Sequence, residues 1–357
     1  MSCVPPLGTA SRGDRETGLE RLGIVIIGRN EGGRLRRCLE SLPRDGTPLV
    51  YVDSGSTDGS AALARQMGCS VVELDDSAPF TAARGRNAGL AWLRERYPAI
   101  AYVQFVDGDC ELSEGWLHVG METLRSRPEV AVVCGRVRER SPGTSVYTRL
   151  CHLEWDATVG EVDWCGGVAM MRVAALRDVN GFDPRWAAAE EPELSARLQG
   201  IGGKLVRITN PMARHDSGMM SFAQWWCRAV RAGQGYTCGM RMSRSAVQRL
   251  CVRRTCGVLF WAGVLPCAAL FLAPWTQGFS FLLLLAHAVP AWRVFRRRHG
   301  TEHSRTDRAL EAVFTMLGKF AQLVGVLTFE LRRMAGRPDF SRYEKRRTSA
   351  EATASPL

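Results

Sequence analysis

Ala101-Tyr-Val-Gln-Phe-Val-Asp107-Gly-Asp109 is the stretch of this chain that decides its fold. Its first six residues form an apolar run rich in Val, Tyr and Phe, which is typical of a buried strand. The two aspartates follow where the strand ends and the chain turns at Gly108. Mg²⁺ and Mn²⁺ prefer carboxylate oxygens and keep positions open for phosphate, so the pattern suits a metal that holds a diphosphate. Taken alone, Asp-x-Asp at a strand end is more often a simple turn.

Two earlier apolar runs also end in small and acidic residues. Ile24-Val-Ile-Ile27 opens into Gly-Arg-Asn-Glu31, and Pro48-Leu-Val-Tyr-Val52 ends in Asp-Ser-Gly-Ser-Thr-Asp58. Helical segments are expected between the strands, at 34–42, 60–67 and 81–96. Strands that alternate with helices predict a mostly parallel sheet, with the ligand site beyond the carboxyl ends of the strands. The chain has neither Gly-x-Gly-x-x-Gly in its first turn nor a P-loop motif, which argues against a dinucleotide dehydrogenase and a P-loop phosphotransferase.

Read in order, these motifs resemble the nucleotide-sugar half of family 2 glycosyltransferases. The matching pieces are Ile-Ile-Gly-Arg-Asn-Glu31, Val-Asp53-Ser-Gly-Ser-Thr-Asp-Gly-Ser, Ala-Arg84-Gly-Arg-Asn-Ala-Gly and Asp107-Gly-Asp. Trp164-Cys-Gly-Gly167, Gly181-Phe-Asp183 and Glu190-Glu-Pro-Glu-Leu194 resemble the acceptor half. The resemblance covers about residues 22–218. The Glu-Glu-Pro-Glu-Leu motif, followed by Gln-Trp-Trp, is similar to a bacterial membrane-associated subgroup.

The resemblance implies an α/β fold of the GT-A (nucleotide-diphospho-sugar transferase) type and an inverting transfer from a nucleotide-activated sugar. Asp53 is expected to hydrogen-bond the base, and Arg84 or Arg86 to lie near the base or the diphosphate. The full set of donor-binding residues implied is Arg29, Asn30, Glu31, Asp53, Asp58, Arg84, Arg86 and Asp107. The metal, Mn²⁺ or Mg²⁺, is expected at Asp107 and Asp109, with His215 either a third ligand or a structural group. Acceptor binding is assigned to Gly166, Gly167, Glu193, Trp225 and Arg228, although core packing is an equal alternative for the tryptophan.

Inversion needs a base that deprotonates the attacking hydroxyl, and Glu191 is the candidate. The family usually has Glu-Asp here, whereas this chain has Glu190-Glu191-Pro192-Glu193. Pro192 suits the first position of a helix that runs through Leu198, which places the acids at its positive end. The acids could therefore simply cap the helix, and Glu190 and Glu193 remain alternative bases.

The second half of the chain changes character at Thr255. Residues 255–292 contain no Lys, Arg, Asp or Glu, and a helical hairpin that turns at Pro274-Trp-Thr-Gln-Gly278 is expected to enter the membrane. A buried soluble pair of helices is the alternative. Arginines on both sides of 255–292 place its two ends on the cytoplasmic side. The flanking segments expected are an Arg-rich interfacial stretch at 221–254, an amphipathic helix at 308–335, and polar tails at 1–20 and 339–357 around a glycosyltransferase domain at 21–220.

Composition narrows the class of protein. The formal net charge is +11, and seven arginines without an acidic residue lie between Cys227 and Arg254, next to the apolar hairpin. This position predicts that the arginines bind anionic lipid headgroups and not nucleic acid. The sequence contains no recognised nucleic-acid-binding motif. The twelve cysteines form no Cys-x-x-Cys, and no apolar signal segment precedes Leu22, so reduced thiols and a catalytic domain facing the cytosol are expected.

The function expected from the sequence is transfer of a sugar from a nucleotide-diphosphate donor to a hydroxyl acceptor, a lipid-linked or cell-envelope glycan. Two rivals are a non-catalytic nucleotide-sugar-binding or assembly protein, which the Glu-for-Asp change permits, and a sugar-phosphate nucleotidyltransferase. A processive synthase is disfavoured because Gln224-Trp-Trp-Cys-Arg228-Ala departs from the Gln-x-x-Arg-Trp motif of such enzymes.

Overall fold

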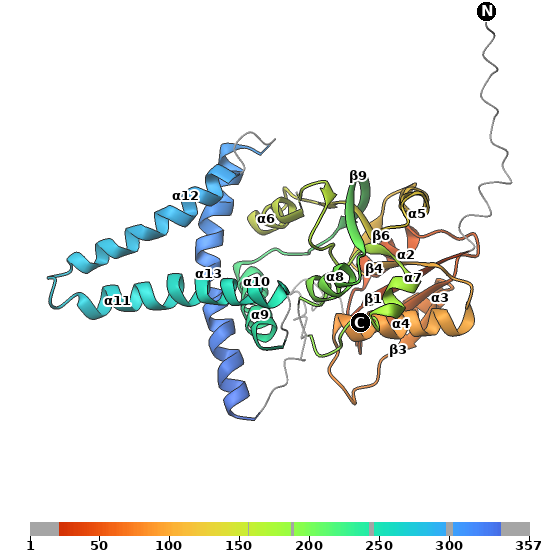
Figure 1. Cartoon of the computed structure of the whole chain (residues 1–357), viewed down its shortest axis with the longest axis horizontal. Coiled ribbons are helices and arrows are strands. Elements are labelled where there is room, and N and C mark those ends of the chain that lie inside the picture. Colours follow the sequence, from red (N-terminus) through yellow and green to blue (C-terminus); the bar gives the residue numbers. More distant parts are fainter. Residues whose placement is uncertain (1–20, 156, 187–188, 243–245, 298–302, 337–357) are drawn as a thin grey trace, which may run out of the picture.

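The computed structural model describes residues 21–155, 157–186, 189–242, 246–297 and 303–336. An α/β domain forms one part of the molecule, and a group of long helices from the second half of the chain forms the other (Figure 1). The tails expected at 1–20 and 339–357 lie outside the described residues.

The α/β domain is built on a nine-stranded sheet of order β3-β2-β1-β4-β8-β6-β9-β5, with β7 beside β9. Four parallel strands carry the motifs found in the sequence: β1 (Leu22–Gly28), β2 (Leu49–Asp53), β3 (Ser70–Glu73) and β4 (Tyr102–Asp107). Their helices are α2 (Gly33–Glu40), α3 (Ser60–Gln66) and α4 (Ala82–Arg96), which confirms the alternation predicted from the sequence. The ends of β1, β2 and β4 therefore meet at one edge of the sheet.

Helix α4 packs very closely on the sheet because glycine lies at the contact. A Cβ at Gly89 would overlap the side chain of Val25 and lie 3.0 Å from that of Val52. Thr81 caps the helix, since its hydroxyl accepts a hydrogen bond of 3.1 Å from the backbone N–H of Arg84. This packing fixes the height of the α4 side chains above the strand ends.

The rest of the sheet is mixed. Its strands are β5 (Cys110–Leu112), β6 (Val130–Glu139), β7 (Gly160–Glu161), β8 (Ala169–Arg172) and β9 (Lys204–His215). Strand β8 runs antiparallel to both β4 and β6, whereas β6 and β9 are parallel. The helices of this region are α5 (Trp116–Ser126), α6 (Val146–Trp155), α7 (Val173–Asp178) and α8 (Glu190–Gly200).

The second half of the chain forms the long helices. After α9 (Phe222–Met242), one continuous arm contains α10 (Ala246–Val258), a π-helical stretch (Leu259–Val264) and α11 (Leu265–Leu272). The chain reverses through 273–278, where Gln277 and Gly278 have φ of 52° and 88°. The returning arm contains a 3-10 stretch (Phe279–His287) and α12 (Ala288–Arg297), and α13 (Arg305–Met334) follows.

Helix α13 is held to both α9 and the α/β domain. The guanidinium of Arg149 on α6 donates two hydrogen bonds, of 2.7 and 2.6 Å, to the carboxylate of Asp307. At the crossing with α9, a Cβ at Gly233 would overlap the carbonyl oxygen of Gln322, and one at Gly325 would overlap that of Val230. The backbones of α9 and α13 are therefore in direct contact.

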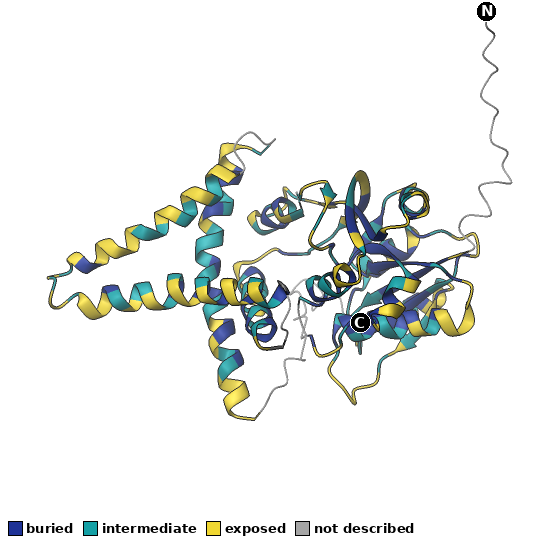
Figure 2. Cartoon of the chain, in the orientation of Figure 1, coloured by how far each residue is buried: buried dark blue, intermediate teal, exposed yellow. Residues whose placement is uncertain are grey.

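Within the described ranges, three helical segments are long and apolar enough to cross a membrane: Val247–Leu272, Phe279–Arg297 and Arg305–Met334. The two arms project away from the α/β domain, and much of their surface is exposed (Figures 1 and 2). Large apolar side chains at their tip are among the most exposed, including Phe271, Trp275 and Phe279, at about 70% each. Exposed apolar surfaces of this kind are typical of sites that contact another protein or a membrane.

Candidate active site

The acidic residues at the end of β4 form a candidate metal site. Asp107, Asp109 and Cys110 offer ligand atoms that all lie within 4.8 Å of one another. Burial, and then the charge of Asp109, raises the pKa of the Cys110 thiol well above its ordinary value, and its sulfur is a softer donor than Mg²⁺ or Mn²⁺ prefers. The carboxylate pair is therefore the better part of the cluster. Oxygen donors of this kind suit Mn²⁺ or Mg²⁺.

His215 lies beside this pair because β5 and β9 are neighbours, with Cys110 opposite His215 in the ladder. Its Nε2 is 3.8 Å from Oδ2 of Asp109. Its Nδ1 is 3.0 Å from Oε2 of Glu139, and the ring packs edge-on against Trp155 at 5.2 Å between centroids. Glu139 was not among the site residues predicted from the sequence. The residue is 76 positions from His215 along the chain, and only the pairing of β6 with β9 reveals the contact.

Arg86 is the centre of a buried charge network. Its side chain, 2% exposed, lies 3.1 Å from Asp107, 2.9 Å from Glu190 and 3.6 Å from Glu191. Burial alone would lower the pKa of this guanidinium, but the three carboxylates together raise it above its ordinary value. Arg86 was predicted to bind the nucleotide sugar. In the structure it joins the strand end that carries Asp107 to the helix that carries the candidate base.

The three candidate bases, Glu190, Glu191 and Glu193, lie in the first turn of α8. The helix begins at Glu190, so Pro192 is its third residue and not its first, as the sequence had suggested. Burial and the neighbouring charge of Glu190 raise the pKa of Glu191 to about 8. Glu193 is bound instead by the guanidinium of Arg197, at 2.7 and 2.6 Å, one helical turn away. This pairing gives Glu193 a structural partner and makes it the weakest of the three candidates.

The glycine pair before β8 lies against the same network. A Cβ at Gly167 would overlap Nη2 of Arg86 and lie 3.0 Å from Oδ2 of Asp107. A Cβ at Gly166 would meet only the ring of Trp155, at an ordinary 3.8 Å. Gly167 therefore lets the backbone cover the Arg86–Asp107 pair.

Asp53 and Asn30 organise the loop at the ends of β1 and β2. Asp53 is buried and accepts hydrogen bonds from the hydroxyl of Tyr51 and the backbone N–H of Ser56, at 3.0 and 2.7 Å. Asn30 accepts one of 2.7 Å from the backbone N–H of Thr57. The predicted donor residues at these two strand ends thus belong to one hydrogen-bonded loop.

Four more residues were predicted to bind the donor. Two of them, Glu31 and Asp58, belong to the same loop region, and the other two, Arg29 and Arg84, lie beside Phe80. Glu31 pairs with Arg34 at 3.1 Å, and Asp58 accepts two hydrogen bonds from Ser60, the first residue of α3. The guanidinium groups of Arg29 and Arg84 lie 5.3 and 5.9 Å from the ring centre of Phe80, a residue absent from the sequence-based set.

Trp225 and Arg228, predicted to bind the acceptor, contact other parts of the protein instead. Trp225 is 8% exposed, and its ring packs edge-on against Phe314 of α13 at 4.9 Å. Arg228 pairs with Glu154 of α6 at 2.7 Å. These contacts join α9 to its neighbours, so the packing alternative describes Trp225, whereas the acceptor role of Arg228, whose side chain is 41% exposed, stays a prediction. A sequence pattern cannot show which face of α9 is covered.

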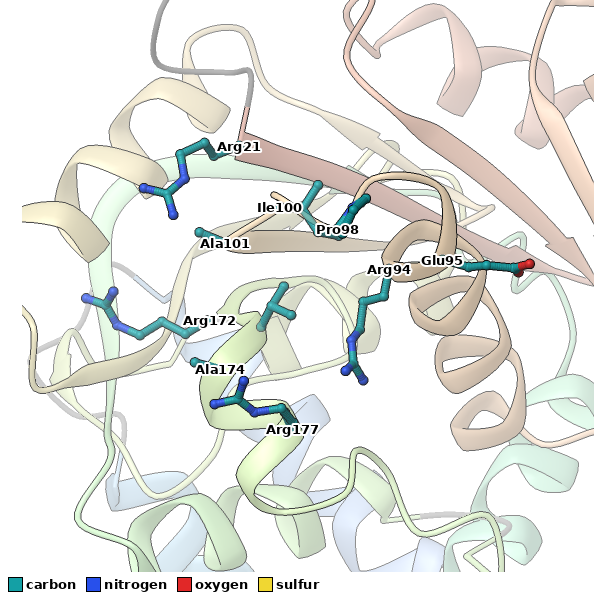
Figure 3. Close-up of a pocket in the computed structure, with 10 residues that line it drawn as sticks. Arg21, Arg94, Glu95, Pro98, Ile100, Ala101, Arg172, Ala174 and Arg177 are labelled. Atoms are coloured by element: carbon teal, nitrogen blue, oxygen red, sulfur yellow. The ribbon is translucent and has the colours of Figure 1, made fainter.

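A cavity of about 580 Å³ lies at the opposite edge of the sheet, near the amino ends of β1 and β4 (Figure 3). Its basic side chains are Arg21, Arg94, Arg172 and Arg177. The guanidinium of Arg172 donates a hydrogen bond of 2.7 Å to the carbonyl oxygen of Val130, and Arg177 pairs with Asp178 at 3.4 Å. None of the acids at the carboxyl edge lines this cavity, so the chemistry described above does not belong to it.

A mixed sheet with metal-suited acids at the carboxyl ends of its parallel strands defines a class, the α/β domains of GT-A type. The mannosyltransferase PcManGT from Pyrobaculum calidifontis, solved in complex with GDP-Man and Mn²⁺, has this fold, with a TM-score of 0.56 and 17% identity over 86% of this chain and 87% of that one. Residues 23–177 match the model of Glycosyl transferase family 2.

Two curated relatives agree with the assignment. Glycosyltransferase AglE of Haloferax volcanii is 22% identical over 69% of this chain and 81% of its own length. The pre-mycofactocin glycosyltransferase of Mycobacterium tuberculosis is 28% identical over 54% of this chain, and the alignment spans only 42% of that relative.

Proposed function

We propose that the protein is a membrane-associated, metal-dependent inverting glycosyltransferase that moves a sugar from a nucleotide-diphosphate donor to a hydroxyl acceptor. One observation carries the proposal: the Arg86 side chain contacts Asp107, a carboxylate of the candidate metal site, and also both Glu190 and Glu191. A group that holds the leaving diphosphate and a group that activates the acceptor are the two requirements of such a transfer. The family 2 domain and the fold of PcManGT support the class of reaction.

The described residues fit a bound divalent cation. Asp107 and Asp109 supply carboxylate oxygens and His215 an imidazole nitrogen that faces Asp109. When bound, Mn²⁺ or Mg²⁺ supplies positive charge that stabilises the departing diphosphate. The protein's own groups do the rest: the loop of Asn30 and Asp53 holds the base and ribose, and Glu191 removes the proton from the acceptor hydroxyl. Arg29, Glu31, Asp58 and Arg84 complete the donor site.

The arrangement and length of the C-terminal helices support the membrane association in this proposal. The two arms project away from the α/β domain, and α13 runs steeply across the first arm and contacts α12 of the second (Figure 1). The first arm, at about 1.5 Å per residue, is about 39 Å long, against a hydrocarbon layer of about 30 Å. Because α13 packs on the first arm at Leu259–Val264, arms that cross the bilayer carry α13 into it, whereas a hairpin that only enters the bilayer leaves α13 near the surface. The acceptor is accordingly a lipid-linked or cell-envelope glycan.

The function is tested with a panel of nucleotide sugars, Mn²⁺ and membrane lipid extracts, scored for labelled product. Asp109→Asn is expected to lower transfer about 10²- to 10³-fold, the usual effect of losing one group that stabilises developing negative charge. Asp178→Asn, at the opposite edge of the sheet, is the matched control. Wild-type transfer in Asp109→Asn would contradict the mechanism. Release of diphosphate from a nucleoside triphosphate would instead identify a nucleotidyltransferase, and nucleotide-sugar binding without any product a non-catalytic protein.

The raised pKa of Glu191 predicts an alkaline-shifted activity. A general base acts only when deprotonated, and this carboxyl loses its proton near pH 8 and not near its ordinary 4.5. We therefore expect kcat/KM, which reports on the free enzyme, to rise with pH through this range. The measurement is a kcat/KM profile from pH 6 to 9 at saturating metal.

Glu191→Gln is expected to lose activity and this rise together, whereas Glu193→Gln should keep the rise. Retention of the full profile in Glu191→Gln, with its loss in Glu190→Gln, would move the role of base to Glu190.

A further inference from the structure

Glu139 is a buried acid that the proposed reaction does not use directly. It ends β6, is 4% exposed, and lies opposite His215 in the parallel ladder with β9. Burying a carboxylate is costly unless hydrogen bonds satisfy it. Here Oε1 accepts from the backbone N–H and the hydroxyl of Ser217, at 3.0 and 3.1 Å, and Oε2 lies 3.0 Å from Nδ1 of His215. The carboxylate is thus held in one orientation, with one oxygen directed at the imidazole.

This contact decides which nitrogen of His215 carries hydrogen. An ionised carboxylate can only accept, so Nδ1 must be the donor. In the neutral ring Nε2 then has a free lone pair, and Nε2 is the nitrogen that faces Asp109, at 3.8 Å. That separation is too long for a hydrogen bond between the two groups. The lone pair is therefore available to a cation that Asp109 also binds.

Packing also restricts the rotation of the imidazole ring. Trp155, the last residue of α6, packs edge-on against the ring at 5.2 Å, and the backbone of His215 is paired with both Cys110 and Glu139 through the ladders of β9. With the ring plane, the tautomer and the backbone all set, His215 has little freedom to turn its Nε2 away.

We propose that Glu139 is a positioning residue that makes His215 a metal ligand and thereby favours Mn²⁺ over Mg²⁺ at the Asp107–Asp109 site. The inference rests on the proposed metal-dependent function. Mg²⁺ prefers all-oxygen surroundings and keeps several of its waters, whereas a transition metal gains more from an imidazole nitrogen. A carboxylate behind a ligating histidine fixes the ring and raises its basicity. Loss of Glu139 should therefore reduce the affinity for Mn²⁺ more than that for Mg²⁺.

The test is calorimetric titration of the full chain in detergent with Mn²⁺ and, separately, with Mg²⁺. Glu139→Gln is expected to weaken Mn²⁺ binding about 10- to 100-fold, the usual effect of removing an outer-shell partner, and to leave Mg²⁺ binding almost unchanged. Glu161→Gln, an exposed acid paired with Lys204 on the same sheet, is the control for charge. Equal Mn²⁺ affinity in Glu139→Gln and wild type would overturn the role of Glu139. Failure of the wild type to bind either ion would instead overturn the metal-dependent function.

A double-mutant cycle separates positioning from general damage to the fold. If Glu139 acts through His215, Glu139→Gln should weaken Mn²⁺ binding no further when His215→Gln is already present. An additional loss in the double variant would contradict the proposal. If Glu139→Gln does not fold, Glu139→Asp serves in its place, because the shorter carboxylate withdraws from Nδ1. ¹⁵N NMR of the histidines gives an independent readout: the Nδ1–H tautomer of His215 should lose its dominance in either variant, and an unchanged tautomer would also overturn the proposal.

Discussion

Replacing Arg86 with methionine is expected to abolish transfer and to destabilise the α/β domain. The guanidinium is the buried cation shared by Asp107, Glu190 and Glu191. Removing one partner of a buried ion pair leaves the remaining charge uncompensated and typically costs about 3–5 kcal/mol. With Arg86 gone, the three carboxyls can coexist only by taking up protons, so the base is neutralised and Asp107 becomes a weaker ligand.

The measurement combines thermal unfolding with the transfer assay. Arg94→Met, an exposed position on the same helix, is the control and should change neither. Arg86→Lys tests geometry separately from charge: it keeps the cation but loses the planar fork that reaches several carboxylates at once, so it should recover stability more fully than activity. A wild-type rate in Arg86→Met would rule out the charge network as part of the catalytic machinery.

The second large effect is expected from Gly167→Ala. The added methyl group would occupy the position of Nη2 of Arg86 and press against Asp107. Because the backbone at Gly167 has no positive φ, alanine itself is tolerated there, and the cost falls on the displaced guanidinium. A shift of about 1 Å in a catalytic group can lower the rate about 10²-fold. We therefore expect a loss of this size in kcat.

The neighbouring glycine supplies an unusually close control. Gly166→Ala adds the same methyl group one residue earlier, where it makes only an ordinary contact with Trp155. It should retain nearly full activity. The quantity to compare is kcat for the two variants at saturating donor. Equal losses in both would show that the loop tolerates no added bulk at all, and that contact with Arg86 is not the cause.

The strand-end acids could be predicted from sequence because parallel strands put their carboxyl ends at one edge. Three apolar runs, each followed by small and acidic residues, were enough to bring Asp53 and Asp107 to that edge. The pairing of Arg86 with Glu190 could not be predicted in the same way. It depends on how closely α4 packs on the sheet, which Gly89 sets through a contact with Val25.

The open choice at Trp225 and the omission of Glu139 have a different cause. A helical pattern shows that Trp225 lies on an apolar face, but it does not show what covers that face, and the cover is Phe314, some 90 positions further along the chain. Glu139 was missed for a related reason, since a lone acid at the end of a strand has no signature until its neighbouring strand is known. Long-range pairing, and not local preference, decides both positions.

The contact between α9 and α13 limits how the protein can reach its substrate. No side chain separates the two backbones at Gly233 and Gly325. One helix therefore cannot shift along the other without a clash between backbone atoms. On the proposed membrane association, the α/β domain and the apolar helices should then tilt and drift as a single rigid body. The depth of sugar delivery would in that case be a constant of the molecule, and an acceptor would have to carry its hydroxyl to that depth on a stem of matching length.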